Sequence, residues 1–157
     1  MLSLVDALNN IAVRVNSMVV SELEQQGHNA TGKLSKSLRN EVDRTSINGY
    51  AEDYSVFVNN RSRPHFFNKA GIENLKEWLR VKGIPAEALW PIIKTIEKEG
   101  TPTRGSYKFS KNGRRTDFVT VVLTEKKNII TESVNEQLLD VLGSSISDIL
   151  NKQKILK

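Results

Sequence analysis

The first 26 residues place hydrophobic side chains at the spacing of an amphipathic α-helix. The residues that recur at steps of four, three, four and three are Leu4, Leu8, Ile11, Val15 and Met18. This spacing gathers them on one helical face, and Gly27 can end the helix in the left-handed conformation. We predict a helix over residues 3–26, whose apolar face has to be covered by its own domain or by a neighbour.

Residues 38–58 have the pattern of a β-hairpin. The first strand is expected over residues 38–47, and Asn48-Gly49 is a strong turn signal. The residues that then alternate on one face of a second strand are Tyr54, Val56 and Val58. Alternation of this kind is typical of a half-buried strand, so we predict that the two strands pair on either side of the Asn-Gly turn.

Two helices are predicted between Asn68 and Gly100. Asn68 can cap a helix over residues 69–82, which Gly83 closes. Its buried side is expected to consist of Ile72, Leu75, Trp78 and Leu79. The prolines after it separate a second helix, which contains Ile92, Ile93 and Ile96 and ends at Gly100. Core packing is the expected role of the tryptophan, because it shares the apolar face of its helix.

The last third of the chain predicts a strand followed by a helix. Residues 100–113 are polar, basic and turn-rich, whereas residues 118–124 alternate like a strand. Residues 129–150 have helical periodicity, and the basic tail 151–157 is expected to fray. The order of elements indicates an α+β fold. In it a small, mostly antiparallel sheet is packed by the long N-terminal helix, two central helices and the C-terminal helix. With no repeat or linker in 157 residues, we expect a single domain over residues 1–157.

Composition narrows the chemistry. The chain is 38% hydrophobic and 26% charged, as in soluble globular proteins, and no apolar run is long enough to span a bilayer. Its first residues have no positively charged flank, so we expect no signal peptide. There is no cysteine, which excludes disulfides, thiol catalysis and thiolate zinc sites. The two histidines, His28 and His65, are too far apart in sequence to indicate a metal cluster.

We expect no catalytic residue, no metal and no cofactor. No phosphate-binding loop or dinucleotide-binding glycine motif is present. His65 is the one serious candidate for catalysis, but it lies within a Pro-His-Phe-Phe run. Such neighbours indicate a packed or interfacial ring rather than an imidazole held between a hydroxyl and a carboxylate.

A basic loop between residues 104 and 115 is the strongest charged feature of a chain whose net charge is +5. Its cations are Arg104, Lys108, Lys111, Arg114 and Arg115. Tyr107 and Phe109 lie among them, so the loop could bind phosphates and stack on bases. The alternative is a hairpin with both aromatic residues inward and a solvated or partner-facing tip. We favour this second interpretation, since a charge patch alone is weak support for nucleic-acid binding. A small basic protein that binds nucleic acid without reading its sequence remains the alternative function.

Residues 61–67 combine arginines with aromatic residues. Arg61 and Arg63 offer planar donors for the carboxylates of a neighbour. Phe66 and Phe67 cannot both face inward if the segment is extended. Exposed aromatic residues beside arginine are typical interface anchors, although one phenylalanine could instead pack under the loop of residues 100–115. The predicted subunit or partner interface therefore consists of Arg61, Arg63, Pro64, His65, Phe66 and Phe67.

Several segments, in this order, resemble one family. The segments are TGKLSKSL (31–38), YAEDYSVFVNN (50–60), LKEWLRVKGI (75–84) and IIKTIEKEGTPTRG (92–105). Together with the amphipathic first helix and the Arg-Pro-aromatic turn, they are similar to the tail-completion, or head–tail joining, proteins of long-tailed double-stranded-DNA bacteriophages. The chain departs from that pattern at Asn59-Asn60, where family members often have Gly-Thr.

This resemblance implies a non-enzymatic structural protein of the virion, assembled in the host cytoplasm into a ring at the head–tail junction. It implies a homo-oligomer, six-fold or alternatively twelve-fold, that contacts other neck, portal or tail proteins and no membrane. Genomic DNA would pass through the lumen without sequence readout. The basic loop of residues 104–115 would face either that lumen or a partner.

Overall fold

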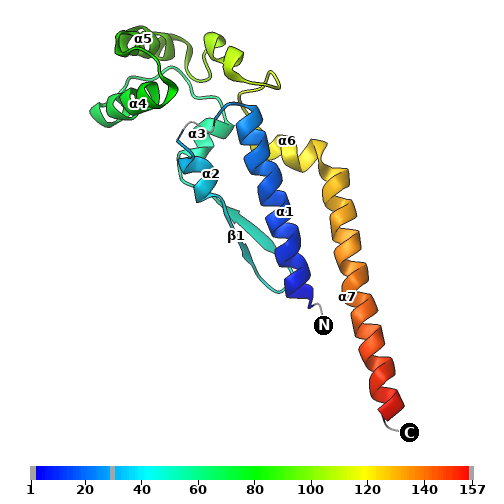
Figure 1. Ribbon diagram of the computed structural model, residues 1–157. Coiled ribbons are helices and arrows are strands. Elements are labelled where there is room, and N and C mark those ends of the chain that lie inside the picture. The colour runs from blue at the N-terminus through cyan, green and yellow to red at the C-terminus, as the bar shows by residue number, and fades with distance from the viewer. Residues whose placement is uncertain (1–2, 29–30, 156–157) are drawn as a thin grey trace.

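The structure, a computed structural model, describes residues 3–28 and 31–155 (Figure 1). Its helices and strands, in chain order, are α1 (Leu4–Gln25), α2 (Lys33–Ser37), β1 (Arg39–Val42), β2 (Ile47–Tyr50), α3 (Ser55–Asn59), α4 (Lys69–Lys82), the 3-10 helix η1 (Ala86–Ala88), α5 (Leu89–Glu99), the 3-10 helix η2 (Arg104–Phe109), α6 (Phe118–Glu125) and α7 (Lys127–Ile155). The fold is α+β, as predicted: mainly helical, with one two-stranded antiparallel sheet.

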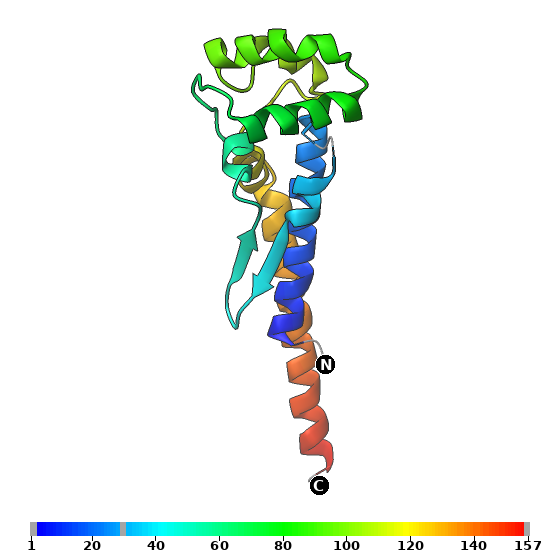
Figure 2. The ribbon, with the colours of Figure 1, turned by 90° about the vertical axis from the view of Figure 1, so that its left-hand side faces the viewer.

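The molecule is elongated and has two parts (Figures 1 and 2). In the first, here called the stem, α1 lies between the β1–β2 hairpin and the α6–α7 pair. The second, here called the cap, consists of α4, η1, α5 and η2 and lies beyond the C-terminal end of α1. The two central helices thus pack on each other rather than on the sheet. Within the described residues, no helix has both the length and the hydropathy needed to cross a membrane.

Helix α1 forms where the sequence predicts it and provides the centre of the stem. Its first turn is closed by a capping box, in which Ser3 Oγ accepts from the Asp6 amide at 3.1 Å and Asp6 Oδ2 accepts from the Ser3 amide at 3.0 Å. Gly27, at φ 73°, follows its C-terminus. The buried residues that join α1 to α2 and α6 are Val19, Leu23, Leu34, Phe118 and Val122. Hydrophobic burial on this face holds the helix in place.

The hairpin is present, but its predicted turn and second strand are wrong. β1 pairs with β2 from Arg39 opposite Tyr50 to Val42 opposite Ile47, so Asn48-Gly49 lies inside β2. The turn is made instead by residues 43–46, where the Asp43 amide donates to the Ser46 carbonyl at 2.9 Å. Asp and Ser supply turn chemistry as Asn-Gly does, so two turn signals competed. Residues 55–59, predicted as strand, form α3.

The predicted strand over residues 118–124 is also wrong, because this segment is helix α6. Its run of β-branched residues favours a strand by propensity. In the structure, however, Phe118, Val121 and Val122 are buried at helical spacing inside the stem, where α6 contacts α1. An apolar run on both faces does not distinguish a buried helix from a strand, and tertiary packing decides here for the helix.

The remaining helices agree with their predictions, with one extension. α4 begins at the Asn68 cap, whose Oδ1 accepts from the Gly71 amide at 2.8 Å, and ends before Gly83 at φ 64°. Trp78 packs, half-buried, against the cap cluster of Leu79, Leu89 and Ile93. α7 continues to Ile155, so residues 151–155, expected to fray, are helical. Residues 156–157 lie outside the described residues.

Candidate interaction surface

The segment with the predicted interface residues is clamped to the end of α5. Ser62 and Thr101 form a backbone bridge, in which the Ser62 amide donates to the Thr101 carbonyl at 2.8 Å. Their hydroxyl oxygens lie 2.7 Å apart. Gly100, at φ 77°, permits this close approach, since a Cβ there would collide with the Ser62 carbonyl oxygen. The clamp therefore fixes the position of the residues on either side of Ser62.

An open groove of about 600 Å³ lies between α3 and this segment. Its lining residues are Val56, Phe57, Asn60, Arg61, Ser62, Arg63, Pro64, His65 and Thr101. Four of the predicted interface residues, Arg61, Arg63, Pro64 and His65, thus share one surface. Val56 and Phe57 add two large hydrophobic side chains that are 56% and 67% exposed. Because this segment was predicted as a strand, the sequence analysis did not identify these two residues as part of the interface.

The two phenylalanines point in different directions, as predicted. Phe66 is 89% exposed, whereas Phe67 is half-buried against the cap cluster. Phe66 therefore does not pack under residues 100–115 of its own chain. The His65 ring stacks on Phe67 with centroids 5.3 Å apart, and its Nδ1 lies 3.0 Å from the Arg63 carbonyl oxygen. His65 is thus an exposed residue whose ring contacts Phe67 and the Arg63 backbone.

The five cations of the basic loop do not form one surface. Arg114 pairs with Glu125 at 2.7 Å, and this hydrogen-bonded pair raises the pKa of Arg114 and lowers the pKa of Glu125. Lys108 lies over the Phe109 ring at 5.1 Å. Arg104 and Lys111 have exposed side chains. Tyr107 and Phe109 lie in η2 rather than in a hairpin, so the predicted hairpin in this loop is wrong.

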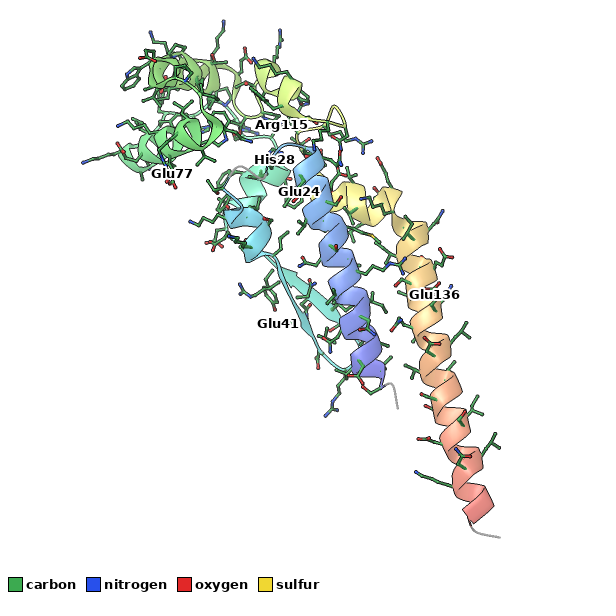
Figure 3. All side chains as sticks on the ribbon, viewed as in Figure 1. Glu24, His28, Glu41, Glu77, Arg115 and Glu136 are labelled. Atoms are coloured by element: carbon green, nitrogen blue, oxygen red, sulfur yellow. The ribbon has the colours of Figure 1, made fainter. Side chains whose placement is uncertain are left out.

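Arg115 points into the junction between the stem and the cap (Figure 3). Its Nη1 donates to the Gln26 carbonyl oxygen at 2.5 Å, and partial burial lowers the pKa of its guanidinium. Gln26 itself is fully buried, and its Nε2 donates to Glu22 Oε1 at 3.0 Å and to the Thr116 carbonyl at 2.9 Å. Arg115 thus joins the loop to the end of α1, while its predicted role toward a lumen or a partner stays a prediction.

His28 completes this junction. Its Nε2 donates to the Arg115 carbonyl oxygen at 3.0 Å. Burial, with a smaller contribution from the Arg115 charge, lowers the pKa of His28 to about 4. Sequence reasoning missed the junction, because its residues come from segments about 90 positions apart and no local pattern connects them.

Among the described residues, no group of three or more His, Cys, Asp or Glu side chains is arranged so that it could hold a metal ion. The groove between α3 and residues 61–65 is mainly apolar, and Arg61 and Arg63 are among its lining residues. Comparison of the chain with protein-family models, with curated proteins and with solved structures gave no match in any of the three.

Proposed function

We propose that this chain is a structural protein of a bacteriophage virion, a subunit of a ring at the head–tail junction that works through contacts between polypeptides. The observation that carries the proposal is the groove between α3 and residues 61–65, with Phe57 and Phe66 exposed at and beside it. Uncovered aromatic side chains next to arginines are the composition of a protein interface. The kind of assembly is inferred from the resemblance of several segments, in the same order, to head–tail joining proteins.

The rigid attachment of the groove supports an assembly role. The Ser62–Thr101 bridge and the stacked His65–Phe67 pair hold the segment in one conformation. Binding to a preformed surface loses little conformational entropy. Arg61 and Arg63 at the rim would pair with carboxylates of the next subunit. In a ring, the groove of one copy meets a different surface of its neighbour, so that contacts close around a rotation axis.

The partners follow from this location. The ring is a homo-oligomer, six-fold or twelve-fold, with portal, neck or tail proteins above and below it. Genomic DNA passes through its lumen. Nucleic-acid binding as the primary function is not advanced, because Arg114 and Arg115 of the basic loop already have partners within the chain.

The test is complementation of a phage that lacks this chain. Phe66→Asp, which changes no packed contact, is expected to leave heads and tails unjoined. The matched control Lys94→Asp, on the exposed face of α5, is expected to restore joined particles. Electron microscopy of the particles, with labelling of the polypeptide, gives the readout. Joined particles with Phe66→Asp, or particles without the polypeptide, would overturn the proposal.

A further inference from the structure

The C-terminal half of α7 exposes a set of large aliphatic side chains. Its members, between 39% and 68% exposed, are Leu138, Leu139, Leu142, Ile146, Ile149 and Leu150. We call this set the α7 stripe. A contiguous aliphatic patch of this kind on a soluble chain marks an interaction site. No described residue of the same chain covers these side chains sufficiently to bury them.

The stripe has the spacing of a coiled-coil seam. Leu139, Leu142, Ile146 and Ile149 follow one another at steps of three, four and three, which is the heptad pattern. Leu138 and Leu150 widen it on either side, so that it covers roughly 120° of the helix circumference at about 100° per residue. A seam between two helices is narrower than this. The width therefore suits a helix with more than one neighbour.

The opposite face of α7 is the one that packs on α1. There Ser133 is buried, Gln137 Oε1 accepts from Asn10 at 2.9 Å, and Glu136 lies 3.7 Å from Arg14. Beyond Ile130, which packs against the stem core, the contacts of α7 with its own chain are made by these small and polar residues, whereas the α7 stripe faces outward. The outward face is polar earlier in α7, at the exposed Asn128, Thr131 and Asn135. The apolar character begins at Leu138 and is specific to this half.

The ribbon gives this half of α7 few neighbours. α1 and α7 run antiparallel, and the C-terminal half of α7 extends past the N-terminus of α1 (Figures 1 and 2). A free helical segment of this length is only marginally helical in water. We therefore expect another surface to cover this part of α7 and to stabilise it as a helix. The heptad spacing of the stripe indicates that this surface consists of helices.

We infer that the α7 stripe packs against the same stripe of further copies of this chain, with the helices parallel. Heptad spacing makes the stripe complementary to itself. Gly143 and Ser145, which flank it, are small and uncharged, so they offer no charge pattern that would select a different helix. If the helices lie along the rotation axis of the ring, all copies run in the same direction and neighbouring helices are parallel.

Lipid is a poorer occupant. A helix that lies on a membrane has a polar face rich in Lys and Arg, whereas this part of α7 carries two acidic residues, Asp140 and Asp148, against two basic ones, Lys152 and Lys154. The stripe also has a limited size: its thirteen positions span roughly 20 Å of helix. This is less than a standard interface provides. The contact is therefore weak between two copies and strengthens when each helix has two neighbours.

The inference rests on the proposed function only for the ring that makes the helices parallel. Its experiment uses the purified full chain, so the two can fail separately. A chain that cross-links as described below but is absent from virus particles would overturn the function and leave the stripe contact standing.

The absence of cysteine from the chain allows a direct test. Leu139→Cys and Ile149→Cys, each alone, are treated with a short bismaleimide cross-linker at raised protein concentration. Both are expected to form covalent dimers, because parallel helices bring equal positions together. Asp140→Cys and Asn151→Cys, close by on the same helix but outside the stripe, are the matched controls and are expected to stay monomeric.

Two outcomes would overturn the inference. The first is that Leu139→Cys and Ile149→Cys cross-link no more than the controls. This result would also be obtained if the stripe bound only a different neck protein. The other is cross-linking only in a mixture of the two variants, which indicates antiparallel helices. As a second measurement, Leu142→Glu with Ile146→Glu in the Ile149→Cys background is expected to abolish the dimer while circular dichroism shows a folded chain. A dimer that persists would also contradict the inference.

Discussion

His28 and Arg115 connect the end of α1 to the basic loop: His28 Nε2 donates to the Arg115 carbonyl oxygen at 3.0 Å. The Arg115 side chain returns to the same turn of chain through the Gln26 carbonyl oxygen. The junction between stem and cap therefore depends on an uncharged imidazole beside a guanidinium. Protonation of His28 would place two positive charges next to each other in a partly buried site.

The stability of the chain is expected to fall as the pH decreases from about 6.5 to about 4. The pKa of His28 is lowered from 6.5 to about 4 in the folded chain, so in this range the unfolded chain binds a proton that the folded chain does not. The loss amounts to at most about 3 kcal/mol, at 1.36 kcal/mol for each pKa unit, and it is complete below the folded pKa. Chemical denaturation across this pH range measures it.

His28→Gln is expected to reduce the pH dependence of the free energy of unfolding between pH 6.5 and pH 4. His65→Gln, which alters an exposed ring, serves as the control and should retain the dependence of the unmodified chain. Equal slopes in the unmodified chain and His28→Gln would contradict the assignment.

Phe118→Ala is expected to lower the free energy of unfolding by about 3–5 kcal/mol, the usual cost of emptying a buried aromatic site. Phe118 is 1% exposed and joins α6 to α1 and α2. Val119→Ala, at the next position but with its side chain exposed, is the matched control and should cost less than about 1 kcal/mol. Similar losses for the two variants in urea denaturation would mean that this segment is not the packed helix described here.

Residues 118–124 show why sequence reasoning failed for some elements and succeeded for others. Helices α1, α4 and α5 were predicted because each has one apolar face and a recognisable start or stop, such as Asn68 and Gly83. Residues 118–124 have apolar side chains on both faces, which removes the periodic signal. Residues 55–59 form only one helical turn, and over so short a length alternation and helical spacing share most positions.

The candidate site was predicted in part for a similar reason. The contrast between Phe66 and Phe67 was predicted from the alternation of neighbouring side chains in an extended segment, and the structure shows Phe66 exposed and Phe67 half-buried. The Ser62–Thr101 clamp and the insertion of Arg115 under the cap depend on residues far apart in the chain. No local pattern encodes such pairings. The sequence therefore predicted an interface over residues 61–67, four of whose residues line the groove, but it did not predict the other wall of the groove, α3.

Gly100→Ala is expected to destabilise the chain and to weaken its assembly. Gly100 has φ 77°, and an added Cβ would collide with the Ser62 carbonyl oxygen that belongs to the clamp. The strain should cost at least about 1 kcal/mol. Gly105→Ala, where an added Cβ has no atom within 4 Å, is the control. Thermal unfolding distinguishes the two, and equal melting temperatures would contradict the role given to the clamp.

Any DNA binding by the basic loop is expected to be weak and to depend on three cations at most. Arg104→Gln, Lys108→Gln and Lys111→Gln together should reduce the slope of log affinity against log salt by no more than about 3, since each phosphate contact contributes about 0.9. Arg114→Gln should leave the slope unchanged, because Arg114 already pairs with Glu125. Fluorescence anisotropy with a duplex measures the slope. A larger reduction, or any reduction with Arg114→Gln, would contradict this assignment.

Phe57→Ser separates an interface role from a core role. The Phe57 side chain is 67% exposed at the groove, so its replacement should change the free energy of unfolding by no more than about 0.5 kcal/mol. In the phage complementation assay, the same variant is expected to impair head–tail joining, because the neighbour would lose an aromatic anchor. Substitution of a core residue such as Phe118 would instead lower the free energy of unfolding. If the Phe57→Ser chain is stable and head–tail joining is normal, the groove is not part of the interface.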